Sequence, residues 1–356
     1  MKPFVRVSIC QLFIMLYISR MVVNATYSSF GSNTNHLYYG FAAALLALPA
    51  TALMVLPVYG AFVTSNGRTI TDNGYDVFKK YGAVIAVVYG LYFLWVLINT
   101  LSRFDIMVTK ELNPSVSVLV LSAAVVAASM YGAYKGIEAL GRASTIIFVF
   151  IAIALIILFC TLLPKADALN FVPVSADNTG EIIDIILNML AINSCIPAMA
   201  ILLPFAKGDC KKGIGIWVAG VYISTAVITA IIIAVMGDYL KTQIFPVYAV
   251  TAIASLGVAE RLDGLFLGVW TAGMFVKVSL FIYLLSACVK RVFGEVISRW
   301  SVLICGVVVF VSSTVISMTD GMFDLLNNNS IMLVFTMLTA VVIPIILIVA
   351  NKITNR

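Results

Sequence analysis

Residues 187–204 read LNMLAINSCIPAMAILLP, an apolar stretch that brings Asn193, Ser194 and Pro197 together near its centre. Proline removes a backbone N–H and clashes with the preceding helical turn, so the carbonyls that it frees need other partners. A helix broken near residues 193–197 is one interpretation of this pattern. A continuous helix with a proline kink, satisfied by neighbouring helices, is the alternative.

The rest of the chain has the composition of a membrane protein. Of its 356 residues, 62% are hydrophobic and 11% are charged, whereas about one quarter of the residues in soluble domains are charged. The mean hydropathy is +1.08. Apolar runs recur along the whole chain, and each is long enough to cross a hydrocarbon core of about 30 Å as a helix. The composition therefore predicts an all-α integral membrane protein that crosses the bilayer many times.

Hydropathy and helix-breaking residues together predict ten transmembrane helices. Their expected boundaries are 4–24, 38–62, 82–108, 114–133, 137–163, 182–206, 213–236, 262–291, 300–318 and 329–350. We expect the first span to be retained, because no small-residue cleavage site follows it. An even number of spans places both termini on the same side of the membrane.

The basic residues indicate the orientation of these spans. Of the 22 Lys and Arg residues, fifteen fall in segments on the same side as the N-terminus, and three lie within spans. The four in the opposite loops are Lys110, Lys165, Lys241 and Arg261. Cytoplasmic loops carry an excess of Lys and Arg, so both termini are predicted to be cytoplasmic.

The order of the spans indicates two halves, about 1–163 and about 182–350, within a single membrane domain that covers residues 1–356. Spans 1 and 6 both carry polar residues, and spans 3 and 8 are among the longest. Because five is an odd number, the second half runs through the bilayer in the opposite sense. Inverted repeats of this kind bind ligands near the midplane, where discontinuous helices expose backbone groups.

Span 1 carries Ser19, Arg20 and Asn24 in its outer third. A charged residue in a span usually faces the bundle interior or a water-filled cavity, so Ser19 and Arg20 are candidate ligand-binding residues. The alternative is that the Arg20 side chain extends to the outer headgroups. The lack of Gly and Pro inside this span weakens the case for a break like that of span 6.

Lys277 lies near the centre of span 8, within MFVKVSLFIY at residues 274–283. A buried ammonium group must pair with an anion, contact carbonyls or lose its proton. Asn193, Ser194 and Lys277 are therefore candidate ligand-binding residues near the midplane. A purely structural contact is the alternative for Lys277.

Span 3 offers a candidate aromatic wall. Tyr92, Trp95 and Asn99 share a helical face, which suits the lining of a site for a small ligand, and Tyr92 and Trp95 are candidate ligand-binding residues. Arg103 and Asp105 follow near the outer end of the span. Ordinary helix packing, with these two charges at the membrane interface, is the alternative.

A further pair of charges opens span 5, in YKGIEALGRAS at residues 134–144. Glu138 and Arg142 stand four residues apart, which permits an ion pair within the helix, and Gly136 and Gly141 permit the close approach of another helix. Together with Pro197 these two charges are candidate structural or gating residues. A basic anchor on the cytoplasmic side is the alternative to an inner gate.

Several functional classes are disfavoured by the sequence. The six cysteines show no CxxC spacing and His36 is the one histidine, so a disulfide scaffold or a metal site is not expected. The basic residues form no patch for nucleic acid. No nucleophile arrangement or nucleotide-binding loop is present. We therefore expect no cofactor and no enzymatic activity.

Five short motifs together resemble a known family. They are QLF at 11–13, GIEALGR at 136–142, LLP at 202–204, FPVYAVTAIASLGVAERLDGLFLGVW at 245–270 and FVKVS at 275–279. In this order and spacing the chain resembles the spore germination permease family, the GerAB-type B subunits of nutrient germinant receptors in endospore-forming bacteria. That family lies within the amino acid–polyamine–organocation superfamily. The resemblance covers nearly the whole chain.

The resemblance implies a ten-span fold of the leucine-transporter type, in which spans 1 and 6 unwind around an amino acid or other small nutrient and spans 3 and 8 line the same site. It also implies an inner spore membrane location, an A-type membrane subunit and a C-type lipoprotein as partners, and sensing rather than bulk transport. The chain departs from many members at YISRMVVN, residues 17–24, where they carry small residues or glycines. The identity of the ligand is therefore not carried over.

Three alternative functions are compatible with these residues. In a sensor, Arg20 would bind a ligand carboxylate, Asn193 and Ser194 would orient the ligand, and Lys277 would occupy the place that a coupling cation takes in related transporters. A proton-coupled or facilitated amino-acid transporter is the alternative, with Lys277 titrating during the cycle. A scaffold that holds a channel-forming partner would need none of these residues for the nutrient response.

Overall fold

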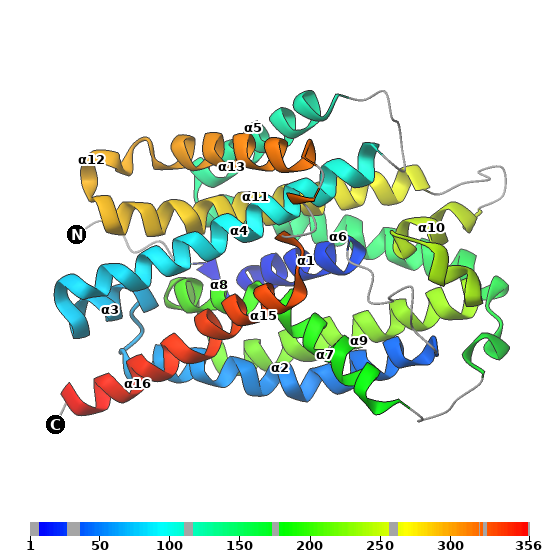
Figure 1. Cartoon of the computed structure of the whole chain (residues 1–356), viewed down its shortest axis with the longest axis horizontal. Helices are drawn as coiled ribbons and strands as arrows, with labels where there is room; N and C mark the ends of the chain where they lie inside the picture. Colours follow the sequence, from blue (N-terminus) through cyan, green and yellow to red (C-terminus); the bar gives the residue numbers. More distant parts are fainter. Residues whose placement is uncertain are drawn as a thin grey trace.

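A computed structural model of the chain describes residues 7–26, 36–109, 117–172, 178–255, 263–319, 321–322 and 326–354. Nine helical segments within these ranges are long and apolar enough to cross a membrane, and one further apolar helix has 17 residues. Across the described ranges, these ten segments confirm the expected number of spans and the multi-pass architecture (Figure 1). The predicted span residues 4–6, 114–116 and 262, and the loop residues Lys110 and Arg261, lie outside the described residues.

The first half of the chain contributes five spans. They are α1 (Ile9–Thr26), α2 (Tyr38–Thr64), α4 (Ala83–Met107), α5 (Val118–Lys135) and α6 (Ile137–Leu162). A short helix, α3 (Ile70–Phe78), and the 3₁₀ turn η1 (Lys79–Gly82) connect α2 to α4. Two more 3₁₀ turns, η3 (Leu163–Lys165) and η4 (Ala168–Phe171), follow α6.

The second half begins with a span made of two helices, α7 (Thr179–Ala191) and α8 (Cys195–Leu202). The next three spans are α9 (Cys210–Met236), α11 (Asp263–Phe293) and α13 (Ser301–Ser317). The last span consists of α15 (Asn329–Met337), the π-helical turn η7 (Leu338–Val342) and α16 (Ile343–Thr354). Short elements join them: η5 (Leu203–Phe205), η6 (Gly237–Thr242), α10 (Pro246–Ile253) and α12 (Glu295–Ser298).

Helices in equivalent positions of the two halves pack against each other. The second span of the first half, α2, lies along α9, the third, α4, lies along α11, and the fourth, α5, lies along α13. Pairing of equivalent helices is what two repeats related by a pseudo-two-fold axis produce. A short parallel bridge between β1 (Val7–Ser8) and β2 (Ala206–Lys207) also holds the start of α1 beside the end of span 6. The packing is consistent with the predicted inverted repeat.

The first span differs from the expectation carried by the family resemblance. Helix α1 runs without interruption from Ile9 to Thr26, so the predicted discontinuity of span 1 is wrong for the described residues 7–26. The physical reason lies in its sequence, which holds no Gly or Pro to release backbone bonds. The Ser19 hydroxyl also stays with the helix, since it donates to the Met15 carbonyl one turn earlier at 2.7 Å.

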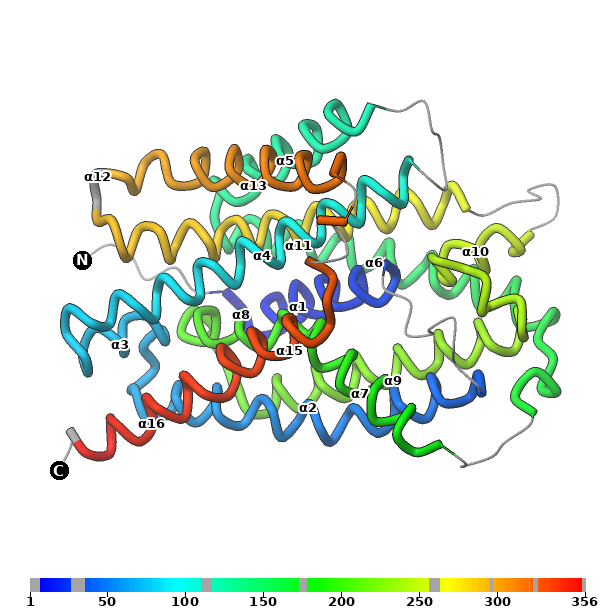
Figure 2. Tube along the Cα trace, in the orientation of Figure 1, coloured from blue at the N-terminus to red at the C-terminus, as the bar shows by residue number. Residues whose placement is uncertain are grey.

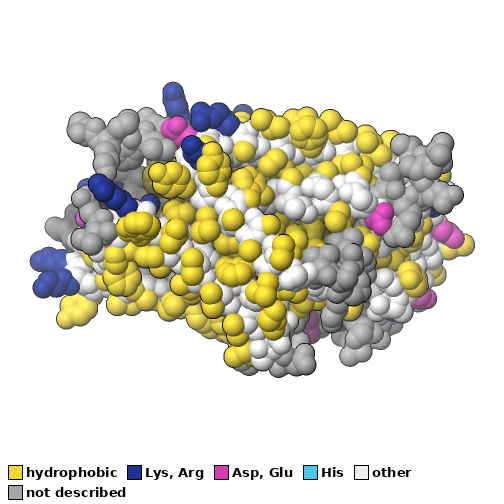
Figure 3. Space-filling view, turned by 90° about the horizontal axis from the view of Figure 1, so that it is seen from above, with side chains coloured by type: hydrophobic (Ala, Val, Ile, Leu, Met, Phe, Trp, Pro, Cys, Tyr) yellow, Lys and Arg dark blue, Asp and Glu magenta, His cyan; other side chains and the backbone are white. Residues whose placement is uncertain are grey.

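The surface of the molecule is divided into an apolar middle and two charged ends (Figure 3). Large apolar side chains such as Leu53 in the middle of α2 and Phe150 in the middle of α6 are more than 60% exposed. Lys and Arg side chains gather at the end that holds α3 and the end of α16, whereas most Asp and Glu side chains in view lie at the opposite end (Figures 1 and 3). Exposed apolar side chains are expected where lipid replaces water as the solvent.

At the basic end, α3 is held against the end of α11. Arg291 forms an ion pair with Asp72 at 3.1 Å, and its guanidinium lies 4.4 Å from the centre of the Tyr75 ring. A second ion pair joins Arg68 and Asp76 on the outer side of α3. The segment between spans 2 and 3 is thereby fixed to span 8.

Candidate functional site

Span 6 is interrupted at Ile192, Asn193 and Ser194, which separate α7 from α8 and are all buried. The predicted break is confirmed, and the structure does not have the alternative, a continuous kinked helix. Pro197 is the third residue of α8. The first four N–H groups of a helix have no intrahelical partner, so proline is tolerated there. Pro197 therefore lies in the first turn of a new helix.

The backbone carbonyls around the break are all bonded. Five of them accept hydrogen bonds from N–H groups two to four residues later, namely those of Asn188, Leu190, Ile192, Asn193 and Ser194. The other two accept from side chains of distant spans: Arg20 Nη2 donates to Met189 O at 3.1 Å, and Thr336 Oγ1 donates to Ala191 O at 2.8 Å. A buried carbonyl without a donor would cost about 1–3 kcal/mol. In this described stretch, no carbonyl from Asn188 to Ser194 lacks a donor.

Arg20 lies inside the bundle. Its side chain is 1% exposed, so it does not extend to the headgroups. Beyond the bond from Nη2 to Met189, its Nε and Nη1 atoms are buried without a hydrogen-bond partner. Burying a charged group is costly unless it is paired and hydrogen-bonded. Arg20 therefore has unused donor capacity beside the break.

Lys277 approaches the same place from α11. It is 3% exposed, and its ammonium lies 5.9 Å from the centre of the Phe281 ring. Helix α11 packs against α1 and α8, and Cys195, the first residue of α8, donates its thiol to the Leu16 carbonyl of α1 at 3.3 Å. Helices α1, α8 and α11 thus meet at the break. Among the described residues, no carboxylate forms an ion pair with Arg20 or Lys277.

The predicted aromatic wall of span 3 packs mainly against α15. The Trp95 ring stacks on Phe335, with ring centres 5.5 Å apart. The hydroxyl of Tyr92 lies 3.1 Å from that of Thr336, which in turn bonds the Ala191 carbonyl at the break. Tyr92 is therefore linked to the break through Thr336, whereas Trp95 belongs to the contact between α4 and α15.

We compared the chain with known protein families and with solved structures. A family model described as spore germination protein matches residues 6–321. The chain belongs to the spore germination protein family. The solved structures that it resembles include one of a substrate-bound, outward-open Na⁺-coupled sialic acid symporter, with a TM-score of 0.60, 13% identity, and coverage of 95% of this chain and 80% of that chain. This likeness concerns the fold alone and confirms the leucine-transporter type. No curated protein matches the chain.

In this spore germination protein, the remaining predicted residues lie away from the break or are bonded elsewhere. Ser19 is buried, but its hydroxyl bonds the Met15 carbonyl of its own helix. Glu138 and Arg142 are both exposed at the start of α6, and they form no ion pair with each other. Gly141 does allow a close approach, because a Cβ there would lie 3.1 Å from the Val7 side chain.

Tyr222 and Thr51, like Thr336, belong to the surroundings of the break and were missed by the sequence analysis. Tyr222 on α9 accepts a hydrogen bond of 2.6 Å from Thr51 on α2 and one of 3.4 Å from the Asn193 amide. All three side chains are buried. Tyr222 therefore ties the break to spans 2 and 7. A single tyrosine in an apolar helix carries no sequence signal that would distinguish this role from packing.

Asp105 is one of the two charges that ordinary helix packing would place at the membrane interface. It is fully buried near the C-terminal end of α4, and it accepts hydrogen bonds from Ser122 on α5 at 2.7 Å and from Ser317 on α13 at 3.2 Å. This group of three residues joins spans 3, 4 and 9. Its hydroxyl donors satisfy the carboxylate without a basic partner.

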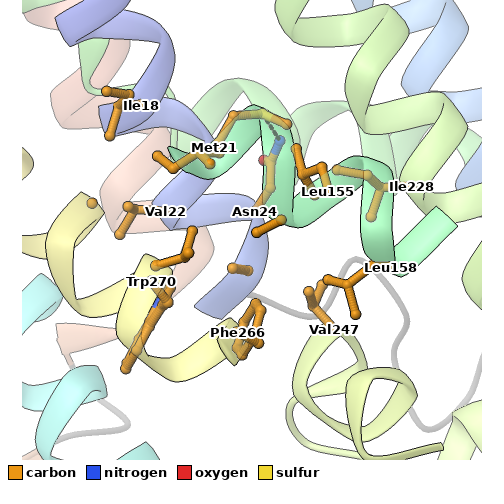
Figure 4. Close-up of a pocket in the computed structure, with 15 residues that line it drawn as sticks. Ile18, Met21, Val22, Asn24, Leu155, Leu158, Ile228, Val247, Phe266 and Trp270 are labelled. Atoms are coloured by element: carbon orange, nitrogen blue, oxygen red, sulfur yellow. Dashed lines mark hydrogen bonds between the residues drawn. The ribbon is translucent and has the colours of Figure 1, made fainter. Parts of the chain in front are cut away.

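An apolar pocket lies beside the C-terminal half of α1 (Figure 4). It contains about 620 Å³ of space, part of it open to the surroundings, and it is lined by side chains of α1, α6, α9, α10 and α11. Its polar lining residue Asn24 donates to Thr225 on α9 at 2.6 Å. None of Arg20, Asn193 and Lys277 lines this pocket. It is therefore an apolar space distinct from the polar site at the break.

Proposed function

We propose that this spore germination protein is the nutrient-sensing subunit of a germinant receptor in the inner spore membrane. A small nutrient binds at the break of span 6, between α1, α8 and α11. The observation that supports this proposal is the buried Arg20 guanidinium, whose Nε and Nη1 atoms have no partner beside the break. A bound molecule that accepts these bonds would remove the cost of an unsatisfied buried cation.

The bound nutrient would act by contacting one arrangement of the two halves better than the other. Arg20 belongs to the first half, and Asn193, Ser194 and Lys277 belong to the second. A ligand that bridges them favours the arrangement in which the two halves meet around it. The change is passed to an A-type membrane subunit and a C-type lipoprotein, which are the partners that the family resemblance implies.

A thermal-shift screen tests the proposal. The purified full-length chain in lipid nanodiscs is heated with amino acids, sugars and nucleosides, because a ligand that binds the folded state raises the apparent melting temperature. We expect at least one compound to raise it. Replacement of Arg20 by Gln is expected to remove that shift.

Ser129→Ala provides the control, since Ser129 on α5 also carries a buried hydroxyl without a partner. It is expected to leave the ligand-induced shift unchanged. The proposal fails if no compound raises the melting temperature, or if the shift is unchanged by Arg20→Gln.

The second candidate function is amino-acid transport, which the likeness in fold to a symporter favours. Uptake of a radiolabelled ligand into proteoliposomes that contain this chain alone separates the two functions. The sensor proposal predicts binding without accumulation. Sustained accumulation of the ligand would instead identify the chain as a permease.

A further inference from the structure

The unpartnered polar groups at the break are mostly hydrogen-bond donors. Arg20 holds one N–H on Nε and two on Nη1, and Ser194 holds one O–H; all are buried without a partner. Lys277 adds an ammonium group to the same region. Asn193 Oδ1 is a hydrogen-bond acceptor at the break that is likewise buried without a partner. A ligand that fits these groups must itself be rich in acceptors.

The backbone offers little to a positively charged ligand group. An ammonium group is bound by carbonyl oxygens or by carboxylates, because it carries only donors. Each carbonyl from Asn188 to Ser194 already accepts one bond, including those from Arg20 and Thr336, so none of them needs a donor from the ligand. Within the described part of the chain, no carboxylate forms an ion pair with Arg20 or Lys277.

The electrostatic field at the break favours a negatively charged ligand group. Arg20 on α1 and Lys277 on α11 are both buried basic side chains, and these two helices pack against each other and against α8. The break also precedes the first turn of α8, and a helix N-terminus carries a partial positive charge. The buried carboxylate of Asp105 is bonded to Ser122 and Ser317 instead. An anion bound at the break would be attracted by both basic groups.

We propose that the break binds a small organic carboxylate, and that an α-amino group is not required for binding. The carboxylate accepts bonds from Arg20 and Ser194 and is attracted by Lys277, while a neutral donor of the ligand, such as a hydroxyl or amide, meets Asn193 Oδ1. This inference rests on the proposed function, since it names the chemical class of the molecule that the site senses.

The test uses four matched compounds for each of three side chains, methyl, ethyl and isobutyl. The compounds are the α-amino acid, the α-hydroxy acid, the amino alcohol and the amino acid amide, and binding to the full-length chain in nanodiscs is measured by titration. We expect the hydroxy acid and the amino acid to bind within about tenfold of each other. The amino alcohol and the amide should bind at least about tenfold more weakly, because they lose a charge-assisted hydrogen bond.

Three variants test whether the carboxylate binds at the break. Ser194→Ala removes a hydroxyl that has no partner in the ligand-free protein, so it should lower carboxylate affinity about tenfold without lowering the melting temperature of the ligand-free protein. Ser129→Ala should change neither quantity. Lys277→Met should also weaken carboxylate binding, which gives a second measurement if an Arg20 variant fails to fold.

The inference is overturned if an amino alcohol binds as tightly as its hydroxy acid, or if removal of the amino group abolishes binding. It is also overturned, while the proposed function stands, if only an uncharged sugar or nucleoside binds and does so in an Arg20-dependent manner. Absence of binding by every compound in the wider screen would instead remove the proposed function.

Discussion

Thr336 on α15 donates a hydrogen bond of 2.8 Å to the carbonyl of Ala191, the last residue of α7. The same hydroxyl lies 3.1 Å from that of Tyr92 on α4. The last span therefore satisfies a carbonyl that the break in span 6 releases, and it connects that carbonyl to span 3. Just beyond it, Tyr89 on α4 donates to the Thr339 carbonyl in the π-helical turn η7.

The first prediction concerns this connection. Thr336→Val keeps the shape of the side chain but leaves Ala191 O and the Tyr92 hydroxyl without this partner, so we expect a loss of about 1–3 kcal/mol in unfolding free energy. Tyr92→Phe should cost less, because Thr336 still bonds Ala191. The thermal or denaturant unfolding of the single and double variants should be non-additive. Additive losses would show that the two hydroxyls act independently.

The second prediction concerns the contact between α1 and α11. A Cβ at Gly273 would lie 2.7 Å from Val22 Cγ2, whereas one at Gly268 on the same helix meets nothing within 4 Å. Gly273→Ala should therefore destabilise the protein by about 1–3 kcal/mol, because overpacking moves α1. Gly268→Ala is the matched control and should leave the melting temperature unchanged or slightly higher. Equal effects of the two variants would contradict the packing described here.

The third prediction concerns the buried carboxylate of Asp105. Ser122→Ala removes a hydroxyl that lies 2.7 Å from both carboxylate oxygens, so we expect it to cost about 1.5–3 kcal/mol of stability. Ser317→Ala removes a longer bond of 3.2 Å from a less buried residue and should cost less. Melting temperatures of the two variants in the same detergent provide the comparison. A larger loss for Ser317→Ala would reverse the expected order.

The fourth prediction concerns the orientation of the chain. Lys80 lies at the basic end and Lys241 in η6 between α9 and α10. In a background with the exposed Cys10 and Cys160 replaced by Ser, Lys241→Cys should react with a membrane-impermeant maleimide in intact cells. Lys80→Cys should react only after permeabilisation, since basic loops stay in the cytoplasm. The reverse labelling pattern would invert the predicted topology.

The sequence was most informative where a residue conflicts with its local setting. Proline and two polar residues in an apolar span are such a conflict, and the break at Asn193 and Ser194 was predicted from them. Lys277 lies so close to the span centre that burial was the expected outcome. For Arg20 the depth alone could not decide between headgroups and interior, because depth does not tell which side of the helix faces the bundle.

The sequence pattern could not predict which residues of distant spans contact each other. Periodicity placed Tyr92 and Trp95 on one face of span 3, but it could not show that this face meets α15. Thr336 looks no different in sequence from Thr339, yet Thr339 bonds its own helix while Thr336 bonds the break. The family resemblance predicted an unwound span 1, and the helix-forming residues of α1 overrode that expectation.

The unbroken α1 has a consequence for the energetics of any switch built on this fold. Two repeats with the same helices would give two conformations of similar energy, related by exchanging the roles of the halves. Here α1 is continuous over the described residues 7–26, whereas its counterpart in the second half is interrupted at residues 192–194. This asymmetry removes the equivalence, so we expect one of the two conformations to be favoured when no ligand is bound.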